Sequence, residues 1–240
     1  MTAHVPHPLP RVRGPRSLLT AAMALILAIG GLTVAAPTAS AGGQAPALGA
    51  AANYAVLAGT AVTCTDGTIA GNVGVFPSTT FTQTNCPITG TIDLGDTVAA
   101  PAQNDFLLAY DQFKALPCDV ALTTVGTRTL SPGAYCFDAA ATLTGTVLTL
   151  DGPSDGIWIF NVGIGGTGAL TGTNFSMAMA GGGQASNVYW RVAEAATMTD
   201  SDFLGTILAG SITLTRGTFH GRALANAEVT ITGTAVTGSN

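Results

Sequence analysis

A three-residue motif, in which an apolar residue lies between small or polar residues and is followed by threonine, recurs five times in the second half of the chain. Neighbouring side chains of an extended strand point to opposite sides. Each copy therefore predicts a short strand with its central apolar residue in a core and its flanking residues, mostly threonine, facing outward. The copies are Thr142-Leu143-Thr144, Ala169-Leu170-Thr171, Thr197-Met198-Thr199, Thr213-Leu214-Thr215 and Thr230-Ile231-Thr232.

Strands this short cannot bury a face alone, whereas stacked repeats of them can. Any single threonine suits an exposed strand position, but stacked copies would align the threonines into two ladders. Glycine, aspartate and proline punctuate the rest of the chain into further candidate strands. These candidates are Val147 to Leu150, Ile157 to Val162, Asn187 to Ala193 and Gly205 to Ala209.

One segment has helical rather than strand periodicity. Its apolar residues recur at intervals of three and four, Pro101 stands at its start and Pro117 stops it, so we expect a helix over about 101–116. At about 1.5 Å per residue it would span about 24 Å, the width of about five stacked strands. The residues on its apolar face are Phe106, Ala109, Tyr110, Phe113 and Leu116.

The chain carries very little charge. Charged residues make up 9% of its 240 residues, whereas about 25% is usual in a globular domain. The formal net charge is -5, and Lys114 is the one lysine. Binding to nucleic acid or to an anionic membrane depends on clustered Lys and Arg, so we expect neither partner.

The N-terminus resembles an export signal. Arg11, Arg13 and Arg16 precede an uncharged apolar run from Leu18 to Val34, and small residues at 39–41 form a cleavage site. We expect residues 1–41 to be a secretory signal peptide and residues 42–240 to be one extracellular domain.

Export also bears on the four cysteines, because thiols oxidise to disulfides outside the cell. Three pairings are possible, and we favour Cys64 with Cys86 and Cys118 with Cys136, since each closes a local loop. The sequence contains no CxxC spacing of the kind that would indicate a zinc site. We expect no metal and no cofactor.

Seven segments, in the same order along residues 42–240, resemble the ice-binding-like family DUF3494. They are LGAAANYAVLAG (48–59), GNVGVFP (71–77), AQND (102–105), LSPGAY (130–135), NVYW (187–190), FLGTILA (203–209) and GRALA (221–225). The resemblance implies a mainly β fold: an irregular right-handed β-helix, or solenoid, of triangular cross-section, with one long α-helix packed alongside. It also implies a secreted ice-binding (antifreeze) protein.

Some members of this family carry a Thr-Ala/Gly-x-Thr/Asn pattern on the binding face. Thr171-Gly172-Thr173-Asn174 fits the whole pattern, whereas the segments beginning at Thr144 and Thr232 fit only its first half. On one flat β-face, rigid threonines could match the array of water molecules at an ice surface. We expect a monomer that binds ice through Thr142, Thr144, Thr171, Thr173, Thr197, Thr199, Thr213, Thr215, Thr230 and Thr232.

Two other classes of protein have to be weighed. Secreted β-helices include polysaccharide-active enzymes that use paired carboxylates, and the candidate pairs here are Asp93 with Asp96, Asp151 with Asp155, and Asp200 with Asp202. Each lies among turn-forming residues, where aspartate commonly caps the backbone, so we expect no enzymatic activity. The same solenoid could also be a structural or adhesive protein that never meets ice.

Two further motifs have ordinary structural interpretations. His220 has no serine or cysteine at catalytic spacing. Gly163 to Gly168 matches a dinucleotide-binding fingerprint in letters, but β-like sequence rather than a helix follows it. We expect a strand or turn histidine and a glycine-rich turn.

Overall fold

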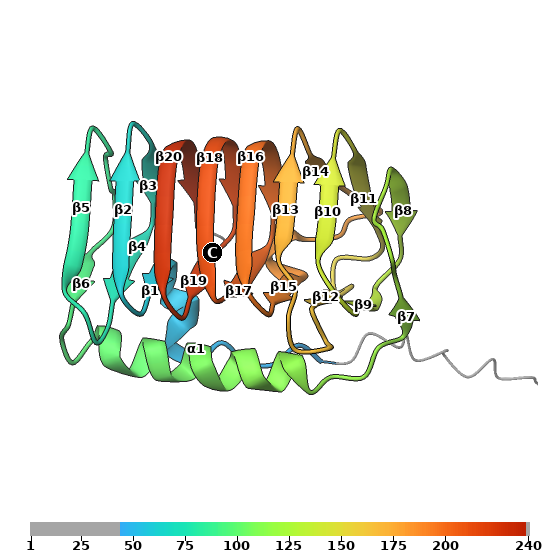
Figure 1. Cartoon of the computed structure of the whole chain (residues 1–240), viewed down its shortest axis with the longest axis horizontal. Coiled ribbons are helices and arrows are strands. Elements are labelled where there is room, and N and C mark those ends of the chain that lie inside the picture. Colours follow the sequence, from blue (N-terminus) through green and yellow to red (C-terminus); the bar gives the residue numbers. More distant parts are fainter. Residues whose placement is uncertain (1–43, 239–240) are drawn as a thin grey trace, which may run out of the picture. The chain divides into compact units, whose positions relative to one another are not determined.

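The computed structural model describes residues 44–238, in which the fold is mainly β (Figure 1). Over this range the strands form two parallel sheets, of nine and eleven strands, accompanied by one α-helix. Two 3-10 turns, η1 (Gly49–Asn53) and η2 (Ala185–Asn187), complete the elements. The expected signal peptide, residues 1–41, lies outside the described residues.

The middle of the first sheet is buried on both sides. Every residue of β1 (Tyr54–Ala58), β12 (Trp158–Val162) and β19 (Ala223–Ala225) is buried, as is typical of a parallel sheet covered on both faces. In spatial order its strands are β6 (Ile92–Leu94), β4 (Asn72–Val75), β1 (Tyr54–Ala58), β19 (Ala223–Ala225), β17 (Thr206–Ala209), β15 (Val188–Val192), β12 (Trp158–Val162), β9 (Gly133–Phe137) and β7 (Val120–Ala121).

The second sheet contains two stacks of strands. The front stack in Figure 1 comprises β5 (Thr80–Thr84), β2 (Ala61–Thr65), the first halves of β20 (Glu228–Thr237), β18 (Ser211–His220) and β16 (Ala195–Leu204), then β13 (Leu170–Thr173) and β10 (Ala141–Thr144). The rear stack comprises β3 (Thr68–Ala70), the second halves of β20, β18 and β16, then β14 (Ser176–Ala180), β11 (Val147–Asp151) and β8 (Arg128–Leu130).

The three long strands pass from the front stack to the rear stack at one residue each. In β16 the alternation of buried and exposed residues shifts by one at Asp200. Asp200, Arg216 and Gly233 occupy this position in β16, β18 and β20, and all three have positive φ angles. A left-handed residue in mid-strand therefore carries the chain from one stack to the other.

The strands expected between the threonine motifs are confirmed, with ends that differ by at most one residue. One motif is wrong in register: Leu170 pairs with Ala141, and Gly172 is the residue beside Leu143. The motif in β13 is therefore Thr171-Gly172-Thr173. A side chain at Gly172 would meet Met198 Sδ at 2.5 Å, so the methionine fills the space where a core residue was expected.

Helix α1 (Ala99–Lys114) begins two residues earlier than expected and ends before Leu116. The Asp96 carboxylate accepts hydrogen bonds from the backbone N–H groups of Val98 and Ala99, at 3.0 and 2.8 Å. These bonds satisfy donors that have no partner within the helix, and Pro101 is tolerated because it lies in the first turn.

The helix packs on the outer side of the first sheet. Its buried residues Ala102, Phe106, Ala109 and Phe113 form a cluster with leucines from three adjacent strands, Leu57, Leu224 and Leu208. Two polar residues hold its C-terminal end. Asn161 Nδ2 donates to the carbonyl of Phe113 at 2.8 Å, and the Arg191 guanidinium lies 4.5 Å from the centre of the Tyr110 ring.

Aromatic side chains occupy the space between the strand stacks. Phe160 stacks on Trp190 with ring centres 3.9 Å apart, and Trp190 contacts Phe203, which stacks on Phe219 at 5.5 Å. All four are buried. Close packing of this kind leaves the strands little freedom to shift.

Both disulfides follow the local pairing favoured from the sequence, and each lies near one end of the stacks. Cys64–Cys86 ties β2 to the loop after the end strand β5. Cys118–Cys136 ties β9 to the segment before the end strand β7. At each end, the segment next to the outermost strand is thus linked covalently to the adjacent strand, which is β2 beside β5 and β9 beside β7.

The path of the chain explains the position of the helix. From β1 the chain builds toward β5 and β6, α1 then runs along the stacks, and building resumes at β7 (Figure 1). The last strand, β20, enters between β2 and β18.

Candidate functional site

Two rows of threonine cross the front stack. Successive strands place a threonine at the same register position, and this is repeated two residues further along each strand. Across β5, β2, β20, β18, β16, β13 and β10, the first row is Thr82, Thr63, Thr230, Thr213, Thr197, Thr171 and Thr142. The second row is Thr84, Thr65, Thr232, Thr215, Thr199, Thr173 and Thr144. We call these fourteen residues the threonine surface.

All ten threonines expected from the sequence lie in the threonine surface. The sequence motif missed four of its members, Thr63, Thr65, Thr82 and Thr84, which belong to β2 and β5. Their central residues are Cys64 and Gln83, which do not look like aliphatic core residues. A search for Thr-x-Thr without an apolar requirement would have found both strands.

The surface rests on a close-packed layer. The residue between the two threonines of a strand points inward, and in β18, β16 and β20 it is Leu214, Met198 and Ile231, each at most 2% exposed. Since the side chains below are locked by packing, the backbone above them is held in place. β-Branching restricts each threonine side chain further.

The spacing of the rows follows from strand geometry. Adjacent strands lie about 4.8 Å apart, and residues two positions apart on a strand are separated by about 6.8 Å. Threonines in the middle of the stack, such as Thr197 and Thr213, are half-buried by their neighbours, whereas Thr142 and Thr82 near the ends are exposed. The site is therefore a regular grid of hydroxyl and methyl groups rather than a pocket.

A column of left-handed residues borders the second row. Each member directly follows a threonine of that row and has a positive φ angle: Asn85, Asp66, Gly233, Arg216, Asp200, Asn174 and Gly145. The patterns that begin at Thr144 and Thr232 therefore cross this border, because their glycines belong to it. Only the Thr171-Gly172-Thr173 part of the matched pattern lies within the surface.

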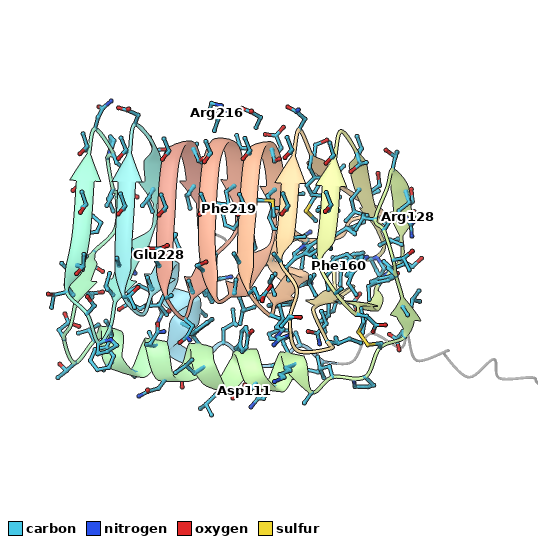
Figure 2. All side chains as sticks on the ribbon, viewed as in Figure 1. Asp111, Arg128, Phe160, Arg216, Phe219 and Glu228 are labelled. Carbon is cyan, nitrogen blue, oxygen red and sulfur yellow. A yellow bond between two sulfur atoms is a disulfide. The ribbon has the colours of Figure 1, made fainter. Side chains whose placement is uncertain are left out.

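Polar groups in this border bind one another. Arg216 Nε and Nη2 donate to the Asp200 carboxylate at 2.6 and 2.7 Å, and Asn85 Nδ2 donates to Asp66 at 2.9 Å. The hydrogen bonds from Arg216 lower the pKa of the Asp200 carboxyl. Figure 2 shows Arg216 above the upper ends of the front strands, where the strands turn to the rear stack.

The first sheet and the rear stack lack this regularity. The first sheet is covered by α1. The rear stack presents a mixture of side chains at its outward positions, including Asp202, Leu204 and His220. Among the residues that the structure describes, the front stack thus offers the repetitive face that the sequence motif predicted.

The carboxylate pairs weighed as catalytic candidates are engaged in structural contacts or lie in turns. Asp93 accepts a hydrogen bond from the Tyr54 hydroxyl at 2.9 Å, whereas Asp96 caps α1. Asp200 binds Arg216, and Asp202 accepts from Thr218 at 2.7 Å. Asp151 ends β11, and Asp155 lies in the turn that follows.

The remaining motifs also have structural positions. His220 is the exposed last residue of β18. Residues 163–168 form a turn between β12 and β13, with positive φ at Gly163, Gly166 and Gly168. Within residues 44–238 we find no cluster of three or more His, Cys, Asp or Glu that could hold a metal. No helix in that range is long and apolar enough to cross a membrane.

The described residues thus define a class of fold in which parallel strands carry two aligned rows of threonine on one stack. The chain belongs to the ice-binding-like family, whose model matches residues 56–237. An ice-binding protein of Nostoc sp. strain HG1 is 41% identical over 197 residues, which cover 77% of this chain and 71% of that protein. An ice-binding protein of Flavobacterium frigoris strain PS1 is 33% identical over 207 residues, covering 77% and 73%.

A solved structure is similar in fold as well. The crystal structure of an ice-binding protein from the Antarctic ascomycete Antarctomyces psychrotrophicus matches with a TM-score of 0.76 and 32% identity. The match covers 82% of this chain and 100% of that one.

Proposed function

We propose that this protein adsorbs to ice through the threonine surface and thereby lowers the freezing point or inhibits recrystallisation. The observation that carries the proposal is the pair of seven-residue threonine rows in one register across the front stack. Family membership and the names of the relatives point to the same ligand.

Binding to ice requires a rigid protein surface. Ice presents a fixed array of oxygens, so a protein binds it without a large entropic cost only if its own groups are already fixed. Threonine hydroxyls can donate and accept hydrogen bonds, while the methyl groups between them carry no charge to impose a competing hydration shell. A grid of about 4.8 by 6.8 Å repeats both features over seven strands.

We extend this proposal to the arrangement of the strand stacks. The three parallel stacks, joined by left-handed residues at one border, fit an irregular right-handed β-helix of triangular cross-section. In this architecture one side carries the helix, one carries the threonine surface and the third is the rear stack. The stacks supply the rigidity that ice recognition requires.

We further propose that the protein acts outside the cell as a monomer. Residues 1–41 would direct export and be removed, leaving residues 42–240 as the active domain. Two disulfides fit an oxidising compartment. The partner would be the ice crystal surface alone, with no catalytic reaction.

The test replaces threonines within the surface. Thr199→Lys introduces a charge at a half-buried grid position, and Thr171→Tyr introduces bulk at an exposed one. We expect both variants to lose ice-crystal shaping and thermal hysteresis while retaining the circular dichroism spectrum and melting temperature of the parent protein.

A matched control is Thr149→Lys, which makes the same change on β11 of the rear stack, where Thr149 is also half-buried. It should retain full activity. Equal activity in all three variants would overturn the assignment of the surface. A parent protein that neither shapes ice nor inhibits recrystallisation would overturn ice binding itself and favour a structural or adhesive role.

A further inference from the structure

A third outward-facing row lies beside the two threonine rows, two residues before the first of them. Its register is fixed by the same strand pairings. Across β5, β2, β20, β18 and β16 this row is Thr80, Ala61, Glu228, Ser211 and Ala195. Apart from Glu228, the residues of this row are short and uncharged.

Glu228 makes no compensating contact with the residues that the structure describes. Its side chain is exposed, and in the described part of the chain its carboxylate takes part in no hydrogen bond or ion pair. Other charged groups near the front stack do have partners: Asp200 binds Arg216, and Glu194 accepts a hydrogen bond from the backbone N–H of Gly168 at 3.1 Å. Figure 2 shows Glu228 at the start of β20, on the front stack and on the side nearer α1.

We propose that Glu228 is a specificity-determining residue that keeps this third row out of contact with ice. The inference rests on the proposed function, and it says which part of the grid is used. Ice would be bound through the two threonine rows, and the row of short residues would be held away by one side chain.

Two physical effects of Glu228 act in the same direction. Its side chain extends three bonds beyond the Cβ atom at which its neighbour Ala61 ends, so it stands above an otherwise level row. Its carboxylate also holds water strongly, and removing that water without supplying a partner costs free energy. An unpaired charge of this kind discriminates against one mode of binding.

The test replaces Glu228 by the residues of its neighbours in the row. Glu228→Ala copies Ala61, and Glu228→Ser copies Ser211. With the full chain, we expect each variant to reach a given thermal hysteresis at about one third of the parent's concentration, because the unpaired charge no longer opposes contact. Fluorescently labelled variants on a single-crystal ice hemisphere should bind a wider area than the parent.

Asp111→Ala is the matched control. Asp111 is an exposed acidic residue on α1, away from the front stack (Figure 2). This control removes the same charge and should leave both readouts at the parent's level. Thermal unfolding checks that all three variants are folded.

The two proposals fail in different ways. A parent protein without ice activity contradicts the proposed function. An active parent whose two Glu228 variants match it in concentration dependence and in the area of ice bound overturns the role of Glu228 and leaves ice binding standing.

Discussion

Residues in a left-handed conformation fix the border of the threonine surface. Five of them are not glycine, namely Asp66, Asn85, Asn174, Asp200 and Arg216. Asparagine and aspartate tolerate this conformation, whereas a residue such as arginine adopts it at a cost of about 1–2 kcal/mol. In Arg216 the bidentate contact with Asp200 offsets part of that cost. The left-handed conformation at the border is therefore stabilised in different ways in different strands.

Two glycines allow backbone strain to be separated from steric clash. Gly145 has φ +59° and open space within 4 Å of the position that a Cβ atom would take, whereas at Gly217, with φ +92°, a Cβ atom would clash with the Ser201 carbonyl oxygen. We expect Gly145→Ala to lower the free energy of unfolding by about 1–2 kcal/mol and Gly217→Ala to lower it considerably more. Denaturant unfolding measures both, and equal losses would contradict this explanation.

At the scale of elements, the sequence predicted the helix, the strands between the motifs and most of the threonine surface. The local sequence pattern failed in strands whose inward position does not carry an aliphatic side chain of its own. In β13 the residue between the two threonines of the surface is Gly172, because Met198 fills the space beneath it. The local pattern points instead to Leu170, which is two residues away. In β2 the inward residue is a disulfide cysteine, and in β5 it is Gln83, exposed at the end of the stack. Such positions depend on neighbouring strands that a local pattern does not contain.

The disulfides should protect the ends of the stacks against fraying. We expect Cys64→Ala/Cys86→Ala to lower stability by about 3 kcal/mol in the chain-entropy estimate. Hydrogen exchange should accelerate most in β5, which has a neighbour on one side only.

The second pair provides a reciprocal control. In Cys118→Ala/Cys136→Ala the accelerated exchange should appear in β7, with β5 unchanged, because β7 is the end strand of the first sheet near that disulfide. Uniform acceleration through the whole sheet in either double variant would contradict a local role.

For the whole molecule, the four tyrosines predict sensitivity to alkali. Burial raises the pKa of Tyr54, Tyr110, Tyr135 and Tyr189 above the ordinary value, and at Tyr54 the hydrogen bond to Asp93 raises it further. The folded protein therefore retains the phenolic protons more strongly than the unfolded chain. This contribution to stability is fully present below about pH 10 and is lost as the pH rises above that value toward the folded-state pKa.

Tyrosinate absorbance and the free energy of unfolding, followed together from about pH 9 upward, test this expectation. Ionisation should accompany unfolding rather than precede it. Tyr54→Phe should make the loss of stability with rising pH less steep. A folded protein whose tyrosines all ionise near their ordinary pKa would refute the prediction.

The place of β20 makes the continuity of the threonine surface depend on the last strand of the described fold. The strand begins at Glu228, near the C-terminus, yet it lies between β2 and β18 within both threonine rows. Without β20, the front stack is divided into a two-strand patch, β5 and β2, and a four-strand patch from β18 to β10. Neither patch has the full grid. Since β20 pairs with β2, a strand far from it in the sequence, this pairing is among the non-local contacts that slow folding. We expect a chain truncated before Glu228 to bind ice less tightly, because the threonine surface is continuous only when β20 is inserted.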